Sequence, residues 1–256
     1  MEAAARERGA HLWWLGQSGF LLQAEERHLL FDPYLSDSLT RKYEGTDRPH
    51  VRMTARVVDP ARLAFVDVVT SSHAHTDHLD PETLSALVSG GATLVCPQAI
   101  VATALERSGV EPVGLRDGES VHLAGFRVEA VPAAHPDPGP AYAGFLVIAR
   151  GRVVYHAGDT LAFSRLVARL APRGVDVALL PINGRLGNMD AVAAASLAHA
   201  TGAGLAVPCH YDMFEFNTAS PHAFAVACDR LGQPYRILRA GERLTLRATR
   251  RAASRA

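Results

Sequence analysis

The chain has 256 residues, of which 48% are hydrophobic, and this size allows one large α/β domain or two small ones. Its 26 basic and 26 acidic residues balance, which argues against a long basic track for nucleic acid. No segment approaches the roughly 18 consecutive apolar residues of a membrane span, and the first ten residues lack an apolar stretch. We therefore expect neither a transmembrane helix nor a signal peptide.

The N-terminal part of the chain predicts three short strands, at residues 11–15, 19–23 and 28–32, that form an antiparallel meander. Asp32 ends the third strand, where it is either an ordinary strand-end cap or a buried carboxylate that orients a neighbouring loop. Residues 35–60 have weak periodicity, many charges and few large apolar side chains, which predicts a long surface excursion. Loops of this length are usually functional, so the excursion is a candidate substrate cover.

Three histidines and one aspartate fall within six residues, and they are His73, His75, Asp77 and His78. The apolar run 66–70 before them predicts a buried strand, and Asp80-Pro81 after them predicts the start of a helix. In an extended backbone, His73 and His75 point to the same side. Imidazole and carboxylate are standard ligands of zinc and related divalent ions. A polar loop whose histidines only hydrogen-bond is the alternative, but the spacing favours a metal site.

The rest of the chain alternates short strands with helices. We expect strands at 93–96, 113–131 (two or three), 142–149, 152–156, 175–181, 204–208, 235–238 and 244–246. We expect helices at 82–89, 97–107 and 188–201, one that ends near residue 170, and one that starts at residue 220. The strands fall in two blocks, each followed by helices, which predicts two sheets packed face to face with helices outside.

Five polar residues come directly after predicted strands: His73, His135, Asp159, Asn183 and His210. Strand ends at one rim of a sheet assembly converge in space, and the loops there carry chemistry on rigid supports. Taken singly, His135, Asp159 and His210 fit ordinary turn or hydrogen-bonding roles as well as ligand roles. Beside a cluster with open coordination positions they become candidate ligands, because two adjacent ions need more ligands than the cluster supplies.

The order of these residues resembles that of the metallo-β-lactamase superfamily along nearly the whole chain. The residues that carry the resemblance are Asp32, His73-Ala74-His75-Thr76-Asp77-His78, His135, Asp159 and His210. Within the superfamily, the chain is most similar to the L-ascorbate-6-phosphate lactonase-like group, through the segments 14–20, 31–37, 181–185 and 210–214 and the pair Asn217-Thr218. The six-residue motif is highly specific, and the single residues gain weight from their order and strand-end placement.

The resemblance implies an α/β fold, an αββα sandwich of two packed mixed sheets with helices outside and two divalent ions at its open edge. It implies that His73, His75 and His135 hold one ion, that Asp77, His78 and His210 hold the other, and that Asp159 bridges the two. Asp32 would then hold a ligand in place without touching the metal. We therefore predict a single domain over residues 1–256, with frayed tails at 1–10 and 248–256.

The ligand set predicts a dinuclear-metal-dependent hydrolase that uses a metal-bound hydroxide, and the resemblance implies a small lactone or phosphoester as its substrate. Two ions about 3.5–4 Å apart polarise the scissile group, stabilise the leaving oxygen and lower the pKa of bound water from about 15.7 toward roughly 7. Asp77 is the candidate for orienting this water or taking its proton. One alternative is a phosphodiesterase or nuclease, or a lipid phosphodiesterase, on the same scaffold. Another is a metal-binding protein without catalysis.

Asn183 and Arg185 are the candidate substrate contacts. The planar guanidinium of Arg185 suits a phosphate or carboxylate, and the alternative is that Arg185 pairs with a local acid. We expect zinc or manganese as the metal. We expect a small molecule as the substrate, and an anionic substrate is one alternative. We expect a cytoplasmic protein with no membrane or nucleic-acid partner, and the sequence is compatible with a homo-oligomer.

Overall fold

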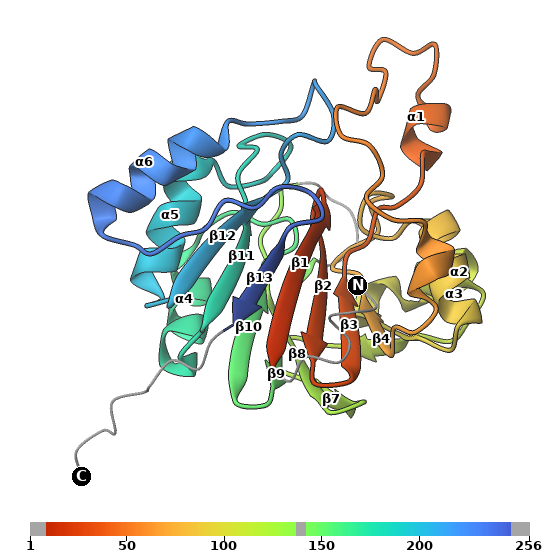
Figure 1. The fold of residues 1–256 in the computed structure, drawn as a ribbon, viewed down its shortest axis with the longest axis horizontal. Helices are drawn as coiled ribbons and strands as arrows, with labels where there is room; N and C mark the ends of the chain where they lie inside the picture. The colour runs from red at the N-terminus through yellow and green to blue at the C-terminus, as the bar shows by residue number, and fades with distance from the viewer. Residues whose placement is uncertain (1–8, 137–141, 247–256) are drawn as a thin grey trace.

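Two β-sheets packed face to face form the centre of the structure, and helices cover the outer face of each sheet (Figure 1). The computed structural model describes residues 9–136 and 142–246. The predicted tail 248–256 and residues 1–8 of the predicted tail 1–10 lie outside the described residues, and Ala10 already belongs to the first strand. The predicted arrangement of two packed mixed sheets with helices outside is confirmed.

The first sheet has seven strands in the order β13-β1-β2-β3-β4-β5-β6. Their bounds are Ala10–Gly16 (β1), Gly19–Ala24 (β2), Arg27–Phe31 (β3), Val68–Thr70 (β4), Thr93–Pro97 (β5), Val113–Leu115 (β6) and Arg243–Leu246 (β13). β1, β2 and β3 form the predicted antiparallel meander, whereas β4, β5 and β6 continue parallel to β3. β13 closes the other edge by pairing antiparallel with β1.

The second sheet has six strands in the order β12-β11-β10-β9-β8-β7. Their bounds are Ser120–Leu123 (β7), Phe126–Pro132 (β8), Ala143–Ala149 (β9), Arg152–His156 (β10), Val177–Pro181 (β11) and Leu205–Cys209 (β12). Neighbouring strands from β7 to β10 pair antiparallel, whereas β11 and β12 run parallel to β10. The strand expected at 235–238 forms only one bridge, between Tyr235 and Ala206, because the chain must then leave this sheet to reach β13 in the other one.

Helices are short and lie on the outside of the sandwich. The α-helices are Ser38–Lys42 (α1), Pro81–Ser89 (α2), Val101–Ser108 (α3), Ser164–Leu170 (α4), Ala191–Ala200 (α5) and Pro221–Leu231 (α6), and the 3-10 helices are Pro60–Leu63 (η2), Gln98–Ile100 (η3) and Ala171–Arg173 (η4). Figure 1 shows α2 and α3 beside the first sheet and α4, α5 and α6 beside the second. Among the described residues, no helix is both long and apolar enough to cross a membrane.

β1 shows why apolar side chains occupy both faces of the first sheet. Leu12 and Trp14 belong to the apolar core between the sheets, whereas Trp13 and Leu15 belong to the core under α2 and α3. Successive side chains of a strand point to opposite faces, so a strand covered on both sides needs apolar residues at every position. Every residue of β1 is accordingly buried.

Glu129 of β8 fixes the chain around α4 and η4 to the second sheet. Its carboxylate, whose side chain is only 3% exposed, accepts two hydrogen bonds from Arg173, at 2.6 and 2.7 Å, and one from Arg169 at 3.0 Å. Arg127 donates a fourth at 3.1 Å. The hydrogen bonds from Arg173, and then the charges of the three arginines, outweigh burial and lower the pKa of Glu129.

We expect Glu129→Gln to lower the free energy of unfolding at pH 7 by about 1.5–3 kcal/mol, the range for hydrogen bonds to a charged group. A carboxylate with a lowered native pKa stabilises the fold above its unfolded pKa, and this contribution is lost as the pH falls through the native pKa. The difference should therefore shrink below about pH 4.3. Denaturation by urea from pH 3 to 7 measures it, with the exposed change Glu111→Gln as control. A difference that does not depend on pH would contradict the ionic role.

Candidate metal centre

Six strands deliver the predicted site residues to one rim of the sandwich. Asp32 follows β3, His73 follows β4, His135 follows β8, Asp159 follows β10, Asn183 follows β11 and His210 follows β12. Parallel strands end on the same side of a sheet, so the shared direction of β3 and β4, and of β10, β11 and β12, sets this convergence.

The rim residues form three groups whose potential ligand atoms lie within 4.8 Å of one another, and one of them, Asp32 with His73 and His78, includes a residue that is not a predicted ligand. The other two groups contain predicted metal ligands only. One group is His73, His75 and Asp159, and the other is Asp77, His78 and His210. The two groups contain six of the seven predicted metal ligands. The exception, His135, is described below.

The carboxylate of Asp159 lies between the two groups. Its Oδ2 is 3.9 Å from Nε2 of His73, whereas its Oδ1 is 3.3 Å from Nε2 of His78 and 3.5 Å from Nε2 of His210. Ligand atoms about 2.0–2.1 Å from a tetrahedral ion are about 3.3 Å from each other. The separations around Asp159 are therefore close to those of atoms that share ions.

The donor set fits divalent cations. Nε2 of His73, Nε2 of His78 and Oδ1 of Asp159 are buried and have no hydrogen-bond partner among the described residues. Leaving a buried polar atom unsatisfied costs about 1–3 kcal/mol. All three atoms point into the region between the two groups, so a bound cation would satisfy them together.

Charges in the cluster are strongly coupled. Burial alone would raise the pKa of Asp159, but the positive charges of His78 and His210 outweigh it and hold the pKa well below the usual range. Burial alone would lower the pKa of His78, but the carboxylates of Asp159 and Asp77 raise it well above the usual value. The carboxylates are thus kept ionised, which is the form that binds metal ions.

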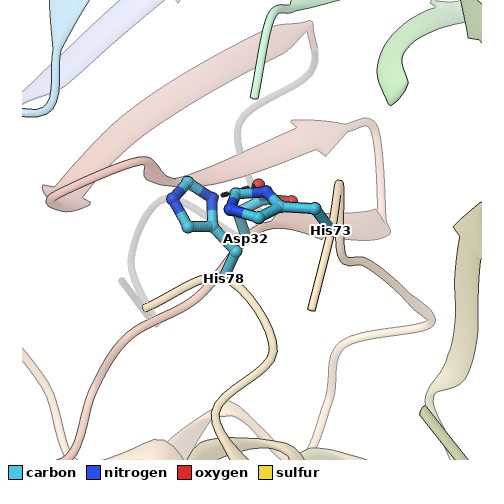
Figure 2. Close-up of side chains that lie close together, drawn as sticks. All are labelled: Asp32, His73 and His78. Atoms are coloured by element: carbon cyan, nitrogen blue, oxygen red, sulfur yellow. Dashed lines mark hydrogen bonds and ion pairs between the residues drawn. The ribbon is translucent and has the colours of Figure 1, made fainter. Parts of the chain in front are cut away.

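Asp32 fixes the histidine-rich loop, and Figure 2 shows its carboxylate beside the ring of His78. Its Oδ2 accepts a 2.7 Å hydrogen bond from Nδ1 of His78 and a hydrogen bond from the Ser72 hydroxyl, and its Oδ1 accepts one from the Ser72 amide at 2.9 Å. Asp32 is fully buried and has a left-handed backbone, with φ of 35°. A carboxylate on Nδ1 leaves Nε2 of the ring available to a metal. Of the two roles considered for Asp32 from the sequence, these contacts correspond to the buried carboxylate that orients a neighbouring loop.

Gly158 allows the strand end at β10 to approach this loop. A Cβ at residue 158 would lie 2.6 Å from both Cβ and Oγ of Ser72, and its φ of 60° is in the left-handed region. No other residue type fits such a position without movement of the backbone. The glycine therefore brings Asp159 within reach of the histidines.

His135 lies beside the cluster but outside the two groups. Its ring centroid is 5.8 Å from that of His75 and 6.4 Å from that of His73, and its ring stacks on Tyr142 at 4.3 Å. Its Nε2 faces Gly187, where an added Cβ would be only 2.4 Å away. The assignment of His135 as a metal ligand stays a prediction, and it requires the ring to turn toward His73 and His75.

The two predicted substrate contacts support a loop instead of facing the cavity. Arg185 donates a hydrogen bond to the carbonyl of Phe216 at 3.0 Å, and Asn183 donates one to the side chain of Asn217 at 2.9 Å. Neither is among the residues that line the cavity at the metal centre, whereas Phe216 and Asn217 are. Their role in substrate binding stays a prediction.

Gln17 is a site residue that the sequence pattern did not single out. It is fully buried in the two-residue turn between β1 and β2, and its φ is 50°. Its Nε2 donates a 2.8 Å hydrogen bond to Oδ2 of Asp77 and lies 3.1 Å from Nε2 of His210. The backbone of His210, with φ of 62°, donates to the carbonyl of Gln17 at 3.0 Å. Gln17 thus fixes two residues of one ligand group.

A cavity of about 360 Å³ opens onto the cluster. Asp77, Asp159 and His210 line it, together with His75. The side chain of Asp77 is 17% exposed, so water can reach its carboxylate. Most of the remaining lining comes from the excursion after β3 and from the loop after β12, and Ala74, Thr76, Arg107 and Leu186 complete it.

Comparison with known proteins gives one family match and several relatives over most of the chain. Residues 27–211 match the family model described as the β-lactamase superfamily domain. A UPF0173 metal-dependent hydrolase of Opitutus terrae is 35% identical over 246 residues, which cover 90% of this chain and 97% of that protein. Another, from Thermoplasma acidophilum, is 30% identical and covers 86% and 91%. The solved structure of Igni18, a metallo hydrolase from Ignicoccus hospitalis, has a TM-score of 0.73 at 25% identity and covers 94% and 99%.

We expect Gln17→Ala to keep the fold but to weaken binding of the metal held by Asp77, His78 and His210 by about 10- to 100-fold, as removal of a residue that orients ligands typically does. Titration against a competing chelator measures this affinity. Gln98→Ala, the same change at an exposed position, is the matched control and should leave the affinity unchanged. Equal affinities in the Gln17 variant and the parent protein would rule out a positioning role.

Proposed function

The chain belongs to the β-lactamase superfamily, as a metal-dependent hydrolase of the UPF0173 group, and from this premise we propose that it uses two divalent ions to hydrolyse a small lactone or phosphoester. The observation that carries the proposal is the position of Asp159. One carboxylate oxygen faces His73 and the other faces His78 and His210, as a carboxylate shared by two ions would. Zinc and manganese both accept this set of imidazole and carboxylate ligands.

Divalent ions at these positions would activate a water molecule and polarise the scissile carbonyl or phosphoryl group. Burial alone would raise the pKa of Asp77, but the charge of His78 and the hydrogen bond from His210 lower it below the usual range. The ionised carboxylate, fixed by Gln17, can accept a hydrogen bond from the attacking water and orient its oxygen toward the substrate. As the bond to the leaving oxygen breaks, that oxygen takes up the proton that the water gives up.

The size of the cavity supports a small substrate. Its volume of about 360 Å³ falls at the lower end of the roughly 300–1,000 Å³ that small-molecule sites enclose. The lactone part of the proposal rests on the similarity of the segments 14–20 and 181–185 to the lactonase-like group. Gln17 and Asn183, which lie in these segments, both hold site residues in place.

We expect purified protein to hold two divalent ions per chain, because Asp159 faces two groups of ligand atoms rather than one. Elemental analysis before and after treatment with a chelator measures the stoichiometry, and hydrolysis of lactones and of bis(p-nitrophenyl) phosphate should disappear and return with the metal. Binding of a single ion after full reconstitution would contradict the dinuclear proposal.

We expect Asp77→Asn to keep the fold and to lower turnover by at least about 100-fold, the lower end of the contribution of acid–base groups. The comparison is made on metal-saturated samples, so that lost affinity for the metal is not mistaken for lost chemistry. Asp229→Asn, the same change at an exposed position of α6, should leave turnover unchanged. Near-normal turnover in the Asp77 variant would remove Asp77 from the reaction.

A further inference from the structure

Part of the cavity lining consists of residues that are not candidate metal ligands and that come from two segments. The excursion after β3 contributes Leu39, Lys42, Tyr43, Arg48 and His50, and the loop after β12 contributes Phe214, Phe216 and Asn217. Figure 1 shows the chain around α1 projecting beyond the ends of the strands, at the end of the sandwich that carries the site. These segments are therefore placed to contact the part of a substrate that does not react.

Four of these side chains form a continuous aromatic wall, which consists of Tyr43, His50, Phe214 and Phe216. The rings of Tyr43 and His50 stack with centroids 4.1 Å apart, and His50 contacts Phe216 at 4.4 Å and Phe214 at 5.0 Å. Burial lowers the pKa of His50, so its ring is neutral near pH 7 and adds to the apolar surface. Such a surface favours a flat, apolar or aromatic body over a sugar-like or fully solvated one.

The aromatic wall is fixed by contacts to its backbone. Arg185 donates to the carbonyl of Phe216, and the amide of Met53 donates to the carbonyl of Met213 at 2.8 Å. Arg52 closes the base of the excursion, because it donates to Asp37 at 2.7 Å and to the carbonyl of Ser36 at 2.6 Å. A wall that is ordered before binding loses less entropy when a ligand stacks on it.

Two cations at this cavity have no acidic partner among residues 9–136 and 142–246. Lys42 and Arg48 line the cavity, and neither forms an ion pair with a carboxylate in the described part of the chain. Arg107 also lines it, but its guanidinium donates to the carbonyls of Ala74 and Leu79. Arg41, next to Lys42, pairs with Glu82. Lys42 and Arg48 are thus the side chains able to neutralise a ligand anion.

We propose, on the basis of the proposed function, that the substrate is a small ester, lactone or phosphoester with a flat aromatic or unsaturated body and an anionic group away from the scissile bond. The reacting bond lies at the metal centre, the body stacks on the aromatic wall, and the carboxylate or phosphate pairs with Lys42 and Arg48. In this arrangement the excursion after β3 recognises the anion, and Arg185 supports Phe216.

Calorimetry on the metal-loaded protein tests the class with three product-like probes. 4-(Carboxymethyl)benzoate carries a ring and two carboxylates, phenylacetate lacks the second carboxylate, and hexanedioate lacks the ring. We expect the first probe to bind about 5- to 30-fold more tightly than phenylacetate, because each exposed ion pair strengthens binding only modestly. We expect it to bind about 3- to 10-fold more tightly than hexanedioate, because of the stacking. Equal affinities for the three probes would overturn the proposal.

Variants assign the two contributions to residues. Replacing both cations, by Lys42→Gln with Arg48→Gln, should abolish the preference for 4-(carboxymethyl)benzoate over phenylacetate and leave phenylacetate binding unchanged. Phe216→Ala should weaken both aromatic probes and spare hexanedioate. Arg41→Gln is the matched control, because Arg41 is paired with Glu82 and does not line the cavity. A preference that survives loss of both cations would overturn their role.

Lys42 also gives a readout that needs no turnover, because it is the only lysine in the chain. An amine-reactive anhydride should acylate Lys42 more slowly in the presence of 4-(carboxymethyl)benzoate than in the presence of phenylacetate, as measured by mass spectrometry of the peptide. Equal protection by the two probes would overturn the proposal. If the metal-loaded protein hydrolyses no ester, lactone or phosphoester, the proposed function fails, and the binding measurements still decide the ligand class.

Discussion

The arrangement of the site depends on the hydrogen bonds of the buried carboxylate of Asp32. It binds the amide and hydroxyl of Ser72 and the ring of His78, and so joins the end of β3 to the loop after β4. Without it, the loop would leave a buried imidazole and a buried amide unpaired. The same contact sets the direction in which Nε2 of His78 points, so the stability of the loop and the geometry of the ligands have a common cause.

The six-residue cluster and the succession of strands along the chain could be predicted from the sequence because both are local patterns. Apolar runs followed by polar residues predict strand ends, and parallel strand ends meet at one rim, which is why Asp159 and His210 were found. Gln17 was missed because its partner Asp77 is 60 residues away, and no spacing rule relates a turn to a loop at that distance. The contact of Arg185 with the Phe216 carbonyl was missed for the same reason.

The structure separates the reacting groups from the groups that choose a substrate. Candidate metal ligands lie at the ends of strands held in two sheets, whereas the aromatic wall and the cations Lys42 and Arg48 come from the excursion after β3 and from the part of the loop after β12 that follows His210. The aromatic residues come from two segments that lie far apart in the sequence, so the contact between these segments appears only in the fold. Loops of this kind can change without disturbing the rigid support beneath them, which is how one fold serves many substrates.

Gln17, Asp32 and His210 share a left-handed backbone, which side chains other than glycine seldom adopt. Each such residue costs on the order of 1–2 kcal/mol relative to an ordinary conformation. Glycine would relieve the cost at any of the three positions but would delete the side chain that the site uses. At Gln17 and Asp32 that side chain also pairs buried polar groups, so the gain from a relaxed backbone would be offset by the cost of leaving those groups unpaired.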